Sequence, residues 1–114
     1  NDPAAGYRLA ESTAEIHAAE LLLYDAAARL DQLGGVENVD PVLNASIIRD
    51  CGFGVKTLAK AVDRLYEASG ANAMRADEPI QRLWRDVNAA RSHAILTWDH
   101  AANMYSRALL DSLQ

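Results

Sequence analysis

The stretch YRLAESTAEIHAAELLLYDAAARLDQL, residues 7–33, decides the fold of this 114-residue chain. Its small and apolar residues recur at alternating steps of three and four, which places them on one stripe of a helix. The stripe consists of Leu9, Ser12, Ile16, Ala19, Leu23, Ala26, Leu30 and Leu33. Because small residues alternate with Leu and Ile along it, a second helix can approach closely and nearly parallel to the axis. Gly34 and Gly35 then end the helix, since glycine readily adopts the left-handed conformation of a C-terminal cap.

A second helix is predicted from Pro41 or Asn44 to Ser69, about residues 44–69. An apolar stripe runs from Ile48 to Leu65 with a second apolar row beside it, and Gly70 closes the helix. Glycine inside a helix costs about 1 kcal/mol relative to alanine. Gly52 and Gly54 therefore indicate that another backbone or a ligand passes close to this helix.

A third helix is predicted over residues 79–113. It begins at Pro79, because the missing N–H of proline costs nothing in a first turn. A continuous helix of this length would span about 50 Å, which is longer than a compact domain of this size is wide. Two of the helices carry apolar surface on more than one side, so a missing fourth helix, an oligomer, or both are expected.

The predicted fold class is therefore all-α, with residues 1–114 forming a single helical-bundle domain or fragment. Its helices would be three long antiparallel members of an up-and-down four-helix bundle, over about residues 6–33, 44–69 and 79–113. The chain starts at Asn1 without an initiator methionine, and we expect it to be a piece of a longer protein.

Charge and composition restrict the classes of partner. Eleven Lys and Arg against sixteen Asp and Glu give a net charge of −5 without a basic patch, which disfavours nucleic-acid binding. No run approaches the roughly 18 apolar residues of a membrane span, and no signal-peptide pattern is present. The single cysteine, Cys51, cannot form an internal disulfide, and we interpret it as a small core residue. We expect a cytoplasmic location, with neither nucleic acid nor membrane as a partner.

The last predicted helix carries a polar row, which consists of Arg82, Asp86, His93, Thr97 and His100. The ordinary interpretation is a solvated face, because an amphipathic helix needs one. The alternative is the wall of a pocket, because apolar residues flank the row closely. His93 and His100 stand seven residues apart, about 10 Å along a helix, which is too far for a shared metal ion. No metal site is predicted.

The run PIQRLWRDVNAARSH, residues 79–93, resembles the last long helix of the acyl-CoA dehydrogenase superfamily. It is more similar to the flavin-dependent monooxygenase branch, of the 4-hydroxyphenylacetate hydroxylase and dibenzothiophene monooxygenase type. Members tend to carry Pro-Leu-x-Arg-x-Trp-Arg-Asp, or Asn in the last place, followed by a His eight residues after the second Arg. That histidine is His93 here. The order of the helices resembles the last three helices of the superfamily's C-terminal four-helix bundle, whose first helix is missing from this sequence.

The resemblance implies a parent protein that is a two-component, flavin-dependent monooxygenase. It would hydroxylate an aromatic or similar small substrate with oxygen and reduced flavin, FAD or FMN, supplied by a separate reductase. His93 would be the catalytic residue beside flavin and substrate, where an imidazole could polarise a substrate hydroxyl near neutral pH. The parent would be a homotetramer assembled through the bundle. No flavin is expected on this chain alone, which would be inactive.

The resemblance also bears on the other candidate site residues. Of the loop positions that contact the flavin of a neighbouring subunit in the superfamily, only Gly70 matches, and weakly. Glu67 stands where the superfamily has Gln, and its carboxylate would repel a pyrophosphate. A structural role is expected for Arg82, Arg85 and Asp86, which would anchor a neighbouring loop or helix.

Two alternatives stay open. The chain could come from an acyl-CoA dehydrogenase, although Ala94 stands where many of these enzymes carry a Glu, and a methyl group cannot act as a general base. It could also be a helical interaction module without an enzymatic parent, whose apolar faces bind a partner helix. Oxidation of an acyl-CoA by the intact protein would favour the first, and a reading frame that starts near Asn1 would favour the second.

Overall fold

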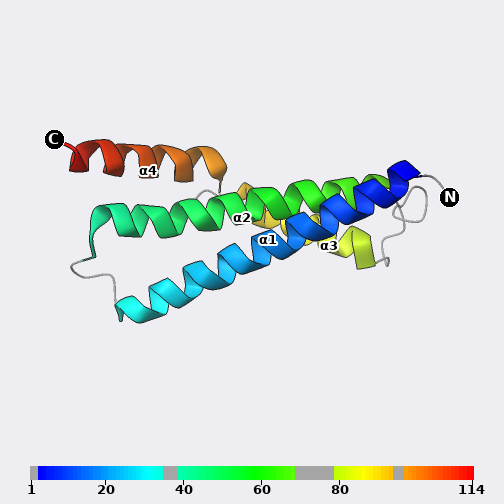
Figure 1. Cartoon of the computed structure of the whole chain (residues 1–114), viewed down its shortest axis with the longest axis horizontal. Helices are drawn as coiled ribbons and strands as arrows, with labels where there is room; N and C mark the ends of the chain where they lie inside the picture. Colours follow the sequence, from blue (N-terminus) through cyan, green and yellow to red (C-terminus); the bar gives the residue numbers. More distant parts are fainter. Residues whose placement is uncertain (1–2, 35–38, 69–78, 94–96) are drawn as a thin grey trace.

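The computed structural model describes residues 3–34, 39–68, 79–93 and 97–114. Within these ranges the chain forms four helices and no strand (Figure 1). They are α1 (Pro3–Leu33), α2 (Pro41–Ala68), α3 (Pro79–Ser92) and α4 (Trp98–Ser112). The prediction of an all-α fold is confirmed.

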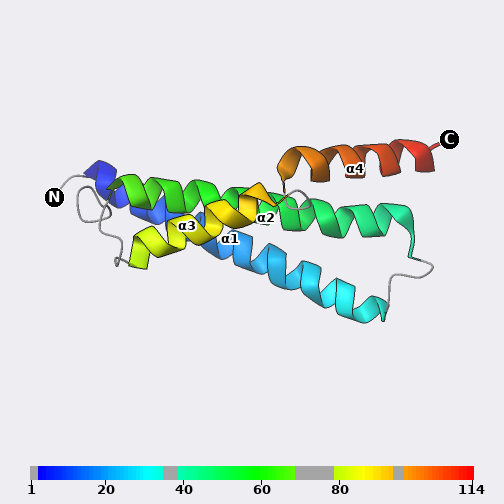
Figure 2. The same ribbon diagram turned by 180° about the vertical axis from the view of Figure 1, so that it is seen from behind.

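The helix α2 is the common neighbour of the other three. It contacts α1, α3 and α4, whereas the described residues of those three helices do not contact one another. In Figures 1 and 2, α3 lies along the C-terminal half of α2 and α4 along its N-terminal half, both antiparallel to it. The packing is therefore three separate attachments to one helix.

The overall shape is elongated, with extents of 55 × 28 × 24 Å. The radius of gyration is 16.9 Å, whereas about 13 Å is typical of a compact domain of this length. Large apolar side chains are exposed on α1 and α4, among them Tyr7, Leu21, Tyr24, Leu109 and Leu110. The surplus apolar surface expected from the sequence is present.

The helix predicted over residues 79–113 is divided in the structure into α3 and α4. The backbone N–H of His93 donates to the carbonyl oxygen of Ala90 at 3.1 Å, and α3 ends there. Thr97 then adopts an extended conformation, with φ −68° and ψ 137°, as the N-cap residue of α4. Threonine at an N-cap and Asp99 in the first turn are signals of a helix start. The apolar periodicity continues across this point, which is why the sequence pattern predicted one helix.

The helix α2 begins at Pro41, the earlier of the two starts predicted for it. Asp40 caps it, because its Oδ2 accepts a hydrogen bond from the backbone N–H of Leu43 at 3.2 Å. A carboxylate at the N-cap followed by proline in the first turn is a favourable way to start a helix.

The helices α1 and α2 meet through small residues. Ser12, Ala19 and Ala26, the small members of the predicted stripe, are the buried residues of α1. On α2, a Cβ atom added at Gly54 would lie 2.9 Å from Leu23 Cγ. Since real Cβ atoms do not approach other carbons so closely, only glycine fits here without a shift. The close approach predicted at Gly54 is made by α1, through the side chain of Leu23 and not through its backbone.

Two polar clusters join α1 to α2. In the first, the buried carboxylate of Asp50 accepts hydrogen bonds from Arg29 of α1 and from Arg49 Nε, the latter at 2.9 Å. The hydrogen bond to Asp50 raises the pKa of Arg49. Both arginines are positively charged, and Asp50 compensates them in a place where an unpaired charge would be costly.

The second cluster surrounds Arg64 of α2. Its Nη1 donates to the fully buried Oγ of Ser12 at 3.0 Å and also to Glu15, and its Nη2 lies 3.1 Å from Glu11. The hydrogen bond to Glu15 raises the pKa of Arg64. The two clusters hold α1 to α2 at points far apart along both helices.

Replacement of Gly54 by valine should lower the free energy of unfolding by about 2 kcal/mol, because the new side chain overlaps Leu23. The matched control is Gly6→Val, since a Cβ at Gly6 meets nothing within 4 Å. That control should stay within about 0.5 kcal/mol of the parent. Urea denaturation followed by circular dichroism measures both, and equal stabilities of the two variants would contradict the close approach.

Asp50→Asn should cost about 2 kcal/mol of unfolding free energy, because it leaves two arginines without their shared carboxylate. Asp25→Asn is the control. Asp25 is exposed and lies 3.0 Å from Arg29, so its loss should cost no more than about 0.5 kcal/mol. The same denaturation experiment applies, and an Asp50 variant as stable as the Asp25 variant would rule out a structural role for the buried carboxylate.

Candidate functional site

The face of α3 that packs on α2 is organised around Trp84. Its indole Nε1 donates to Oδ1 of Asp63 on α2 at 2.6 Å. Its ring stacks on that of Tyr66, with 4.9 Å between centroids and 22° between planes. Val87 lies one turn further along and is buried in the core cluster with Val62. The indole is therefore fixed both by its ring face and by its N–H group.

Side-chain hydrogen bonds organise the last two turns of α3. Asn88 Nδ2 donates to the carbonyl oxygen of Trp84 at 2.8 Å, and Arg91 donates to Asn88 Oδ1. Arg91 Nη1 lies 3.5 Å from Oδ2 of Asp63. Ser92 Oγ donates to the carbonyl oxygen of Asn88 at 2.9 Å. We call Asp63, Trp84, Asn88 and Arg91 the α2–α3 ring, because each is linked to the next and the last returns to the first.

An open cavity of about 380 Å³ lies where α3 ends, α4 begins and α2 passes. Its described lining residues are Lys56, Arg91, Thr97, Trp98 and Asp99. The Trp98 ring is held on α2 by an edge-to-face contact with Phe53, with centroids 5.3 Å apart, and by Lys56 Nζ at 5.2 Å from its centroid. Two cations, one carboxylate, a hydroxyl and an indole therefore line the cavity, and its cations and indole can contact a planar or anionic group.

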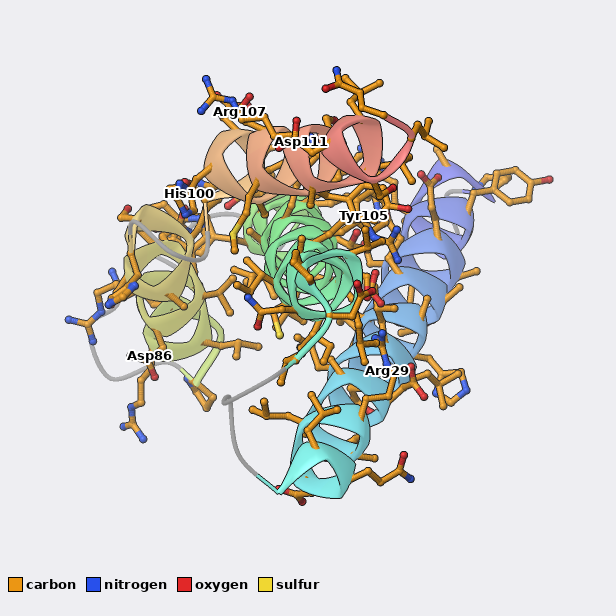
Figure 3. The ribbon with its side chains drawn as sticks, turned by 90° about the vertical axis from the view of Figure 1, so that its left-hand side faces the viewer. Arg29, Asp86, His100, Tyr105, Arg107 and Asp111 are labelled. Atoms are coloured by element: carbon orange, nitrogen blue, oxygen red, sulfur yellow. The ribbon has the colours of Figure 1, made fainter. Side chains whose placement is uncertain are left out.

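The helix α4 is attached to α2 at a second point along its length. The guanidinium carbon of Arg49 lies 4.3 Å from the centroid of the Tyr105 ring, a cation–π contact (Figure 3 labels Tyr105). The position of Thr97 and Trp98 at the cavity therefore depends on α2.

His93 follows α3 directly and its side chain is exposed. In the chain it stands between Arg91 and Thr97, which both line the cavity, but His93 is not among the described lining residues. The predicted catalytic residue is thus close in sequence to two lining residues, but its own side chain is exposed and is not one of them. Its catalytic role stays a prediction.

The other members of the predicted polar row are divided by the break between the helices. Arg82 and Asp86 are exposed on α3, and His100 is exposed on α4. Figure 3 shows Asp86 on the side of α3 that faces away from α2. The row does not form one face of one helix. Arg85 is exposed as well, and the anchoring role expected for Arg82, Arg85 and Asp86 stays a prediction.

The predicted flavin contact falls outside the described residues. Gly70 and Ala94 both lie in ranges that the structure does not describe, and Glu67 is exposed near the end of α2. Among the described residues, no three His, Cys, Asp or Glu side chains are grouped to hold a metal ion. No helix in the described ranges is both long and apolar enough to cross a membrane.

No sequence pattern singled out Asp63, Asn88, Lys56 or Arg91. A single sequence shows that these residues are polar and lie on helices, but it does not pair residues across helices. The one available signal was the placement of Asp63 directly after Val62 of the apolar stripe, where an acid needs a partner if a helix covers it.

Comparison with known proteins gives the family. The family model described as acyl-CoA dehydrogenase, C-terminal domain, matches residues 1–98. The chain belongs to this family. One similar protein of this acyl-CoA dehydrogenase type is HsaA, the oxygenase subunit of a flavin-dependent monooxygenase from Mycobacterium tuberculosis. It is 37% identical over 95 residues, which cover 82% of this chain and 24% of HsaA.

Two further comparisons agree. The oxygenase component of the FADH2-dependent resorcinol hydroxylase from Rhizobium sp. (strain MTP-10005) is 32% identical over 116 residues, covering 95% of this chain and 28% of that protein. The crystal structure of HsaA from M. tuberculosis superimposes with a TM-score of 0.81 at 32% identity, over 97% of this chain and 29% of that one. The chain spans about a quarter of the length of these relatives. The resemblance to the monooxygenase branch is confirmed.

Burial raises the pKa of the Cys51 thiol, which disfavours the reactive thiolate. In the folded chain at pH 8, Cys51 should react with iodoacetamide about tenfold more slowly than in urea. Because folding favours the protonated thiol, the raised pKa adds to the free energy of unfolding. This contribution is fully present below the ordinary thiol pKa and is lost as the pH rises through the raised value. Cys51→Ser should abolish that loss of stability above the ordinary thiol pKa. Equal alkylation rates in the folded and unfolded chain would contradict the buried environment.

Proposed function

We propose that this chain is the C-terminal helical part of the oxygenase component of a two-component, flavin-dependent monooxygenase. The observation that carries the proposal is the match to monooxygenase oxygenases over nearly the whole chain, in sequence and in fold. The substrate class is a phenol, because one relative is a resorcinol hydroxylase and resorcinol is a phenol. An acyl-CoA dehydrogenase and a module without an enzymatic parent are less well supported, since these relatives are oxygenase components.

The proposed cofactor is reduced flavin, as FAD or FMN. A relative described as FADH2-dependent supports FAD. Four of the five described cavity residues fit such a group in their chemistry, and the fifth, Asp99, is an acceptor for its N–H and hydroxyl groups. Lys56 and Arg91 can pair with its anionic parts, Thr97 offers a hydroxyl, and Trp98 offers a flat apolar surface. When bound, reduced flavin supplies two electrons, so that one atom of O2 enters the substrate ring and the other leaves as water. These residues form one wall of the site.

The proposed role of His93 is to handle the proton of the substrate hydroxyl. An imidazole can accept this proton near neutral pH, and the phenolate that results has a more electron-rich ring, which attacks an electrophilic oxygen more readily. The exposed position of His93 at the end of α3 leaves its imidazole accessible to a substrate held by other segments of the parent. The isolated chain lacks those segments and is inactive.

The remaining proposals concern assembly and the other predicted residues. The parent forms a homotetramer through this bundle, which the exposed apolar side chains of α1 and α4 support. It receives reduced flavin from a separate reductase in the cytoplasm. Gly70 contacts the flavin of a neighbouring subunit through its backbone, and Arg82, Arg85 and Asp86 anchor neighbouring segments of the parent.

In the intact oxygenase, His93→Ala should lower product formation by about 100-fold, because a positioned acid–base group is lost. Assembly should be unchanged, since the side chain is exposed. The control is His17→Ala, an exposed histidine on α1, which should keep activity within about twofold of the parent. Hydroxylated product is measured with reduced flavin, oxygen and a phenol. Near-normal turnover of the His93 variant would refute its role, and acyl-CoA oxidation by the intact protein would favour the dehydrogenase alternative.

A further inference from the structure

We propose that Asp63 of α2 is a positioning residue for the hydroxylation, because it holds the last turn of α3 and so sets the place of His93. This inference rests on the function proposed above and adds a residue that no sequence motif indicated. Asp63 touches neither the cavity nor His93, so its action is through Arg91 and Trp84.

The first step is the geometry of the α2–α3 ring. Trp84 and Arg91 stand seven residues apart, two helical turns, and therefore share one face of α3. Asp63 engages both of them with its two oxygens: Oδ1 accepts the indole N–H at 2.6 Å, and Oδ2 lies 3.5 Å from Arg91 Nη1. One carboxylate thus fixes α3 at two points along its axis, which restrains both its rotation and its translation on α2.

The second step is the isolation of α3 within the described chain. It has 14 residues, it contacts α2, and its described residues contact neither α1 nor α4. The helix α3 ends at Ser92, so His93 lies just beyond its last helical residue. The orientation of the last turn then depends on the contacts of α3 with α2.

The third step connects Asp63 to the neighbourhood of His93. Asn88 links the ring to Ser92, whose Oγ donates to the Asn88 carbonyl oxygen at 2.9 Å, and Ser92 directly precedes His93. Arg91 is also a lining residue of the cavity. Loss of the carboxylate would therefore release a cation at the cavity and loosen the turn that precedes the imidazole.

The fourth step separates positioning from stability. The side chains of Asp63 and Arg91 are 36% and 44% exposed, and ion pairs of such exposure contribute little to folding. The stacked Tyr66 ring and the buried Val87 remain when Asp63 is changed, so α3 stays attached to α2. The expected consequence is a folded protein whose α3 terminus is less well ordered.

The experiment uses the intact oxygenase and compares Asp63→Ala, Asp63→Asn and Trp84→Phe. Hydrogen–deuterium exchange of the peptide that covers residues 84–93 should be about tenfold faster in Asp63→Ala. The fraction of consumed O2 that appears as hydroxylated phenol should fall about tenfold, because a displaced acid–base group meets the substrate less often. The remaining O2 takes the two electrons of reduced flavin and two protons and leaves as hydrogen peroxide.

The other variants separate the two contacts. Asp63→Asn keeps an acceptor for the indole N–H and should recover part of both losses, whereas Trp84→Phe keeps the aromatic stack, removes the donor and should show both losses. Asp50→Asn is the control for lost stability, because it breaks a buried ion pair at the α1–α2 contact, away from α3. It should lower the melting temperature without faster exchange at residues 84–93 and without added peroxide.

Three results would overturn the positioning role. They are unchanged exchange in Asp63→Ala, faster exchange with unchanged product per O2, and the same changes in the Asp50→Asn control. Failure of the proposed function itself is recognised separately, because the parent oxygenase would then form no hydroxylated phenol, whatever the exchange at α3 shows.

Discussion

Every contact between helices in the described part of the chain involves α2, and this constraint shapes the rest of the structure. One helix must present a different surface to each of three neighbours. It offers small residues and Gly54 to α1, Asp63 and Tyr66 to α3, and Phe53 and Arg49 to α4. The helix therefore has buried residues around much of its circumference, which is why its sequence shows two apolar rows.

Polar contacts give these attachments their register. Apolar side chains can slide past one another at small cost, whereas a carboxylate and a guanidinium bind in few relative positions. Asp50 and Arg64 fix α1 on α2, and Asp63 fixes α3. The contribution of such pairs to stability depends on burial, so Asp50 matters for folding and the more exposed Asp63 matters for geometry.

The sequence predicted the fold class and the nature of the α1–α2 contact. The stripe with Ser12, Ala19 and Ala26 is buried as expected, and the helical Gly54 meets a neighbouring helix. The break between α3 and α4 was not predicted, because apolar periodicity outweighed the weaker start signals of Thr97 and Asp99. Periodicity reports which face is covered, and both helices are covered by the same α2.

The candidate site was less predictable than the fold. His93 was found through a motif, which carries information about a whole family, and the structure places it at the end of α3 with its imidazole exposed. The α2–α3 ring was not found, because partners on different helices cannot be matched from one sequence. The cavity depends on the meeting of three helices, and Lys56 on α2 gave no local sign of its neighbour Trp98.

The break after α3 also bears on how sequences of this family can diverge. The two short helices share a support and do not contact each other, and the family match ends at residue 98, where α4 begins. A substitution in α4 that favours contact with a different segment therefore leaves the contacts of Trp84 on α3 unchanged. The surface of α4 can therefore change while the stretch that carries the imidazole keeps its own contacts with α2.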